Sequence, residues 1–298
     1  MKRFIIFLSL LCLVLSSPSM ASAGEEYART MKQDLLCLML AYPEYVEGIE
    51  KDEKGCVYVR MKTGKKIIYD DKESKTAAEK LNRADLQDTL QEAYPLGGRT
   101  VLMENNRDPG RYRCYELLNQ VYGGNRSVIE KRLKSTSFAY ESILFNSTNN
   151  AAAALEKTGL KLASLMKEPR IFKAIYPGSD TYNYRVIAGT SNLSPHAYGI
   201  AIDLARDPRD YWQWAVREAG AKRLKDYPSE VVEAFEENGF IWGGKWWHFD
   251  ILHYEYRPEI ILKAQFFGVS TDGEWYQGAS LENSWVGECV QKINNALD

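Results

Sequence analysis

The strongest structural constraint in this sequence is the segment Ser194–Asp203, which reads SPHAYGIAID. Gly199 permits a tight turn, and after it the aliphatic residues Ile200, Ile202 and Leu204 alternate with Ala201 and Asp203. Such alternation predicts a short strand that buries its aliphatic side chains on one face and presents the carboxylate on the other. His196, before the turn, and Asp203, after it, are therefore expected to converge on one point.

This pair of residue types suits a zinc site. Hydrolytic zinc commonly takes three protein ligands from histidine and carboxylate side chains and leaves the fourth position to water. The chain of 298 residues has three histidines, so a third imidazole ligand is either His248 or His253. Three residues before His248 stands Lys245, which cannot act as a carboxylate base. His253 is preceded at the same spacing by Asp250, which can, and the sequence therefore favours His253 as ligand and Asp250 as base.

Two conditions accompany this hypothesis. The chain must bend between Asp250 and His253, because strict strand alternation would place them on opposite faces. Glu255 shares the face of His253 and is expected to support its imidazole. Other interpretations remain: His196 as a packed core histidine, Asp203 as a loop cap, Asp250 as an ion-pair partner of Arg257, and Ser194 as a turn residue before Pro195.

The distribution of helical and strand patterns predicts an α+β fold. Helices are expected at 25–42, 75–93, 149–167, 208–221 and 228–238 and from Glu282 onward, with short helical stretches near 112–133. Strands are expected at 183–188, 240–242 and 251–256, and a β-hairpin at 56–69 turns at Thr63-Gly64. The elements lack a regular βαβ rhythm. We therefore predict a small antiparallel sheet carrying a zinc site, flanked by helices, and a mainly helical N-terminal region that contains the hairpin.

Residues 1–23 have the form of a cleaved secretory signal peptide. Lys2 and Arg3 precede an apolar run that is too short to span a membrane, and Ala21-Ser-Ala23 resembles a cleavage site. We expect a periplasmic or secreted protein without a stable membrane anchor, divided into an N-terminal region at 24–150 and a second domain at 151–298 that carries the expected zinc site. Cleavage after Ala23 leaves 36 basic and 40 acidic residues, a net charge of −4 that argues against a nucleic-acid partner.

Four cysteines remain after this cleavage, namely Cys37, Cys56, Cys114 and Cys289. An even number in a chain routed to an oxidising compartment predicts one or two disulfides, with the pairing left open. None of the four lies within four residues of another, so they do not form a metal-binding knuckle.

The string Ser194-x-His196-x-x-Gly199-x-Ala201-x-Asp203, followed by Asp250-x-x-His253-x-Glu255, resembles the family of zinc D-alanyl-D-alanine carboxypeptidases and L-alanyl-D-glutamate endopeptidases. The Trp242-Gly-Gly244 segment resembles one branch of these peptidoglycan enzymes. The resemblance is specific over residues 182–259. It is looser upstream, at Ala41-Tyr-Pro43, Asp108-Pro-Gly-Arg111 and Tyr122-Gly123.

The resemblance implies zinc ligands at His196, Asp203 and His253, and a general base at Asp250. It places Ser194 beside the substrate, with Arg185 as the nearest basic residue for a substrate carboxylate or the scissile carbonyl; a surface ion pair is the alternative for Arg185. The implied activity is hydrolysis of D-Ala-D-Ala or L-Ala-D-Glu type bonds in peptidoglycan stem peptides. His248 occupies a Trp-Trp-His context but lacks the acid, so it is expected to line the cleft instead.

Two other classes of function were weighed against a zinc peptidase. A non-catalytic module that binds zinc or peptidoglycan would use the same residues, but a full ligand set with a base disfavours it. A serine or cysteine hydrolase lacks support, because the chain has no Gly-x-Ser-x-Gly motif.

Overall fold

The computed structural model describes residues 20–178, 180–269 and 273–298. Most of the expected signal peptide at 1–23, including Cys12, therefore lies outside the described residues, and the first helix begins at Met20. No helix within the described ranges has both the length and the apolarity needed to cross a membrane.

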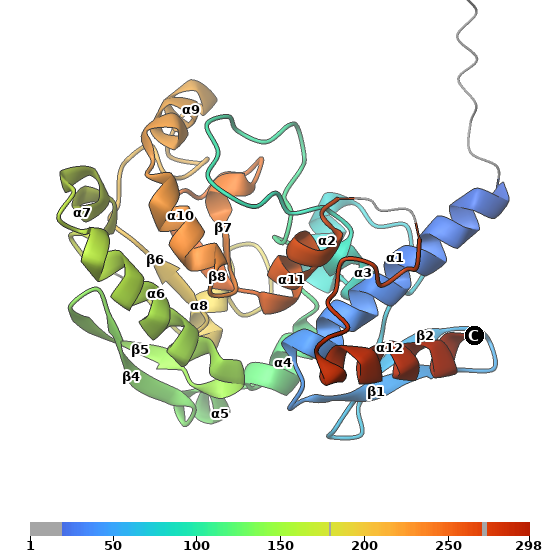
Figure 1. Cartoon of the computed structure of the whole chain (residues 1–298). Helices are drawn as coiled ribbons and strands as arrows, with labels where there is room; N and C mark the ends of the chain where they lie inside the picture. The colour runs from blue at the N-terminus through green and yellow to red at the C-terminus, as the bar shows by residue number, and fades with distance from the viewer. Residues whose placement is uncertain (1–19, 179, 270–272) are drawn as a thin grey trace, which may run out of the picture.

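The fold is α+β, with helices around three small antiparallel sheets (Figure 1). The α-helices are α1 (Met20–Ala41), α2 (Ala77–Arg83), α3 (Leu86–Leu90), α4 (Tyr115–Tyr122), α5 (Arg126–Glu130), α6 (Ala151–Leu165), α7 (Pro169–Ile175), α8 (Pro195–Tyr198), α9 (Arg217–Asp226), α10 (Ser229–Glu236), α11 (Pro258–Phe267) and α12 (Ser284–Leu297). The strands are β1 (Val46–Lys51), β2 (Val57–Met61), β3 (Lys66–Ile68), β4 (Leu133–Phe138), β5 (Glu141–Asn146), β6 (Ala201–Asp203), β7 (Phe240–Trp242) and β8 (His253–Tyr256). Two short 3₁₀ turns are η1 (Thr148–Asn150) and η2 (Gly243–Lys245).

The predicted hairpin at 56–69 is confirmed as β2 and β3, and Gly64 adopts the positive φ of +85° that its turn requires. The strand β1 pairs with β2 and enlarges the hairpin to three strands. A second hairpin, β4–β5, was not predicted. It turns at Ala139 and Tyr140, which both have positive φ, and neither is a residue that marks such a turn in a sequence.

The helices on the two sides of the molecule pack against different elements. On one side α1 packs against α11, α12 and β1, burying Leu35, Leu36 and Leu38 completely. Figure 1 shows α12 beside β1, so the C-terminal helix packs on an N-terminal strand. On the other side α6 packs on β4 and on α10, and α10 packs on β7. Elements from before and after residue 150 thus pack against each other, and the boundary at 150 stays a prediction.

Three expected elements are wrong in part. The helix expected at 75–93 is two helices, because Ala84 is extended and Asp85 starts α3 with a capping box to Asp88. The expected strand at 183–188 is an irregular segment with a single bridge from Val186 to Leu193.

The helix expected at 208–221 begins only at Arg217. Upstream of it, the main chain pairs with the segment before β8: Tyr211 bridges to Asp250, and the amide of Trp212 donates to the carbonyl of Phe249 at 3.0 Å. These long-range contacts replace the helical hydrogen bonds that the local pattern favours.

The sheet that carries the expected site has the strand order β6-β8-β7. Strand β6 pairs with β8 so that Asp203 lies opposite His253 and Ala201 lies opposite Glu255. The predicted small antiparallel sheet is therefore present, and its register brings two of the expected ligands from 50 residues apart into direct contact.

Candidate metal centre and active-site cleft

His196 reaches the site on the one-turn helix α8. Ser194 caps this helix, with its Oγ accepting from the His196 amide at 3.3 Å, and Gly199 ends it with φ +68°. Asp203 then follows on β6, as the alternation after Gly199 predicted. The side chain of Asp203 is half-buried, while Ile200, Ile202 and Leu204 are buried.

Three ligand atoms converge at this point. The Nε2 atom of His196 lies 3.2 Å from both Nδ1 of His253 and Oδ1 of Asp203, and the latter two are 2.8 Å apart. A tetrahedral zinc ion with bonds of about 2.0–2.1 Å separates its ligand atoms by about 3.3 Å, close to this arrangement. The three residues could therefore hold a metal ion, and their donor types and separations suit zinc.

The second ring nitrogen of each histidine is also placed. Nδ1 of His196 lies 2.7 Å from the carbonyl oxygen of Thr181 and must donate to it, which leaves the Nε2 lone pair facing the centre. Nε2 of His253 lies 3.8 Å from Oε2 of Glu255, on the side away from the centre. The bond to Thr181 thus sets the tautomer of His196, and Nδ1 of His253 points at the same centre.

The electrostatics of the centre favour a cation. Burial acts to raise the pKa of Asp203, but the two imidazoles hold that pKa well below its usual range. Burial lowers the pKa of His253, yet the carboxylates of Asp203 and Glu255 outweigh this effect and raise the pKa to about 10. In a site free of metal a proton thus occupies His253, and a divalent cation would take over the same role of balancing the carboxylates.

Asp250 lines the same cleft, directly before β8. Its carbonyl accepts from the His253 amide at 3.1 Å, so residues 250–253 form the bend that the hypothesis required. Burial raises the pKa of the Asp250 carboxyl to about 7, and Asp203 adds to the rise while His253 opposes it. The alternative pairing with Arg257 is not found, because Arg257 binds Glu255 and Glu259 instead.

The cleft around these residues has a volume of about 340 Å³. Its walls combine basic and aromatic side chains with the centre itself, and they include Arg111, Arg113, Arg185, Ser194, His196, Asp203, Tyr211, Trp212, Trp246, His248, Asp250 and His253. This volume is in the range of small-molecule and short-peptide sites.

Arg185 and Ser194 both line the cleft. The side chain of Arg185 is exposed at its rim, and no carboxylate in the described part of the chain forms an ion pair with it. Its guanidinium is therefore available to a ligand. Ser194 has a structural role as the cap of α8, and its expected contact with substrate stays a prediction.

His248 lies in the cleft wall rather than in the centre, as expected. Its Nδ1 is 2.6 Å from Oδ2 of the buried Asp108, and its ring packs edge-on against Trp212. Lys245 points into the core, where it pairs with Glu236. Trp242 is also core, since it stacks on Tyr227 and its Nε1 donates to the carbonyl of Ile251.

Sequence reasoning missed the part of the cleft that comes from the N-terminal half. Asp108 and Arg111 belong to the Asp-Pro-Gly-Arg segment, which stood out as a motif without an assigned role. Arg113 had no signal at all, yet it is buried and binds Glu255 through two nitrogens.

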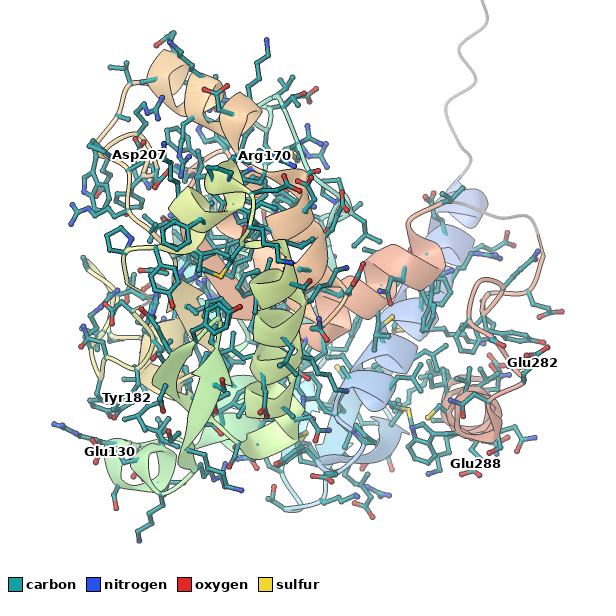
Figure 2. The ribbon with its side chains drawn as sticks, turned by 60° about the vertical axis from the view of Figure 1, so that its left-hand side comes forward. Glu130, Arg170, Tyr182, Asp207, Glu282 and Glu288 are labelled. Carbon is teal, nitrogen blue, oxygen red and sulfur yellow. The ribbon has the colours of Figure 1, made fainter. Side chains whose placement is uncertain are left out.

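The chain segment before α8 is fixed by contacts with α5. The hydroxyl of Tyr182 donates to Oε1 of Glu130 at 3.1 Å, and Figure 2 shows these two labelled residues next to each other at the edge of the molecule. This contact fixes the segment that leads from Thr181, the partner of His196, to Arg185.

Two other expectations can be judged here. The expected disulfides are absent, because the four cysteines of the described ranges are free thiols on four separate segments. A second group of acids, Asp70, Asp71 and Asp85, is already paired with lysines. The ammonium of Lys75 lies 2.6 Å from Asp71 and 2.9 Å from Asp85, and Lys72 lies 2.9 Å from Asp70. Lysine side chains thus supply the positive charge in that group.

A comparison with protein families gives one match. The family described as D-alanyl-D-alanine carboxypeptidase matches residues 188–256. The matched segment contains His196, Asp203, Asp250 and His253, and it confirms the resemblance stated from their spacing. No curated protein and no solved structure matches the chain.

Proposed function

We propose, from the match of residues 188–256 to the D-alanyl-D-alanine carboxypeptidase family, that this chain is a zinc-dependent peptidase of peptidoglycan stem peptides. The bonds cut would be of the D-Ala-D-Ala or L-Ala-D-Glu type. One observation supports the proposal above the others: the ligand atoms of His196, Asp203 and His253 converge within 3.2 Å in a cleft that also contains Asp250.

In this proposal His196, Asp203 and His253 hold the zinc ion. Zinc in such a site supplies a Lewis acid and lowers the pKa of a bound water to about 7. Asp250 accepts the proton of the attacking water and then returns it to the leaving amine. Its position in the same cleft as the three ligands supports this role.

Arg185 is proposed to bind the substrate. Its guanidinium lies on the cleft wall without an ion-pair partner in the described residues, and it matches in charge either a substrate carboxylate or the oxygen of the scissile carbonyl. The predicted signal peptide would deliver the enzyme to the periplasm or the outside of the cell, where such peptides occur.

The test is to incubate the secreted chain with two muropeptides, one ending in D-Ala-D-Ala and one containing L-Ala-D-Glu. Products are followed by mass spectrometry with and without a zinc chelator. We expect cleavage of at least one substrate, abolished by the chelator and restored by added zinc. Binding of either peptide without metal-dependent cleavage would instead favour a non-catalytic module.

Substitutions then assign the roles. Asp250→Asn should lower kcat by about 100-fold or more, because it removes the proton acceptor, and should leave the zinc content unchanged. His253→Ala should lose zinc, whereas His248→Ala should retain it, since His248 binds Asp108 outside the centre. Unchanged turnover of the Asp250 variant would remove Asp250 from this role.

A further inference from the structure

The segment 107–113 lies outside the matched residues 188–256, yet several of its residues contact them. The amide of Trp247 donates to the carbonyl of Arg107 at 2.7 Å, and Nε1 of Trp246 donates to the carbonyl of Pro109 at 2.9 Å. The irregular chain between α3 and α4 that ends in this segment lies beside α9 in Figure 1, where Arg217 donates to the carbonyl of Met103.

Gly110 lets the segment approach closely. It has φ +81°, and a Cβ atom there would lie 2.7 Å from Ile241 of β7 and 2.9 Å from Ile260 of α11. Its carbonyl accepts from Nη1 of Arg257 at 3.1 Å. The segment therefore lies between β7 and α11. This position places Arg113 next to β8.

Arg113 binds Glu255 in a two-pronged contact. Nε lies 2.9 Å from Oε1, Nη2 lies 2.6 Å from Oε2, and the two residues are 5% and 0% exposed. The guanidinium therefore sets the orientation of the Glu255 carboxylate, because it holds both carboxylate oxygens at once.

The contact continues on both sides of Glu255. Toward the centre, Oε2 faces Nε2 of His253 at 3.8 Å, on the ring edge opposite the ligand atom Nδ1. Away from it, Glu255 accepts from Arg257 at 3.3 Å, and Arg257 donates to Glu259 at 2.6 Å. Glu259 also accepts from the hydroxyl of Tyr42 at 2.6 Å, at the end of α1. A row of buried, alternating charges thus connects the N-terminal region with the metal ligand.

We propose that Arg113 is a positioning residue of the metal site, which fixes the His253 ring by fixing the Glu255 carboxylate. The inference rests on the proposed metal site. If Arg113 has this role, the N-terminal region contributes to the centre, because Arg113 precedes its partner Glu255 on β8 by 142 residues in the sequence.

The test measures zinc affinity of the full secreted chain by competition with a chromophoric chelator, without any assay of activity. Arg113→Met should weaken zinc binding about 10- to 100-fold, the usual effect of losing a partner that orients a ligand. Arg113→Lys restores the charge but not the two-pronged geometry and should lie between Met and the native residue. The absorption bands of the cobalt-substituted protein should shift in the same order.

The control is Lys263→Met. Lys263 pairs with the buried Asp34 at 2.5 Å, between α11 and α1, and neither residue lines the cleft. This variant removes a comparable charge pair and should lower stability while leaving zinc affinity within about twofold. Equal losses of affinity in the control and in Arg113→Met would overturn the proposal, since the effect would then be general loosening.

A double substitution tests the route through Glu255 and serves if Arg113→Met folds poorly. In a Glu255→Gln background, Arg113→Lys should weaken zinc binding no further, because the residue through which it acts is already changed. Additive losses would overturn the proposal. A native chain that binds no zinc would overturn the proposed function as well, whereas native binding with an unaffected Arg113→Met overturns this inference alone.

Discussion

At the scale of single residues, the two histidines of the Trp-Trp-His…His segment have different partners. His248 binds the buried Asp108, and His253 meets His196 and Asp203. The two histidines also differ in their nearest candidate base. Asp250 and His253 belong to one turn, because the His253 amide donates to the Asp250 carbonyl.

The raised pKa of His253 predicts that zinc affinity depends on pH. The folded metal-free protein holds a proton on His253 below pH 10, above the ordinary value for histidine, and that proton must leave before Nδ1 binds zinc. Raising the pH therefore strengthens binding, by about tenfold per unit for each proton released. Chelator competition between pH 6 and 8 should show this slope, and a flat profile would contradict the protonated state.

At the scale of elements, Gly199 controls the geometry between α8 and β6. Its φ of +68° disfavours other residues, and a Cβ there would lie 2.6 Å from Leu133 and 3.3 Å from the amide of Asn146. This turn brings His196 and Asp203 together, so the geometry of the candidate metal site depends on its shape.

We expect Gly199→Ala to destabilise the protein more than a matched substitution in open space. Gly189→Ala has a similar φ of +79° and meets nothing within 4 Å, so it should cost only the backbone strain of about 1–2 kcal/mol. Gly199→Ala should cost about 1–3 kcal/mol more, because Leu133 and β5 must move. Urea unfolding measures both, and equal costs would show that the contacts give way freely.

At the scale of the whole molecule, packing rather than disulfides holds the described chain together. Cys37, Cys114 and Cys289 are buried in the core, and burial raises the pKa of each thiol, to about 12 for Cys114 and about 11 for Cys289. Such thiols stay protonated and unreactive.

A reducing agent should therefore leave the melting temperature of the secreted chain unchanged. Thiol titration of the denatured chain that starts at Gly24 should count Cys37, Cys56, Cys114 and Cys289 as free. A fall of several degrees on reduction, or a missing pair of thiols, would show that a disulfide forms after secretion.

The local part of the site follows from the sequence alone. The spacing around Gly199 predicted the turn and strand that carry His196 and Asp203, and the structure confirms both. This prediction succeeded because strand alternation acts over a few residues. The choice of Asp250 as base and of His253 as zinc ligand stays a prediction. The strand at 183–188 and the helix at 208–216 were wrong where long-range main-chain contacts replaced local hydrogen bonds.

Only the tertiary structure decided which residues surround that site. Asp108 and Arg113 reach His248 and Glu255 across 140 and 142 residues, through a segment without helix or strand periodicity. The free thiols likewise depend on which elements pack together. Local patterns indicate how a segment folds. A buried ion pair, by contrast, forms where packing brings two distant charges together and excludes water. The spacing of residues along the chain does not predict such a contact.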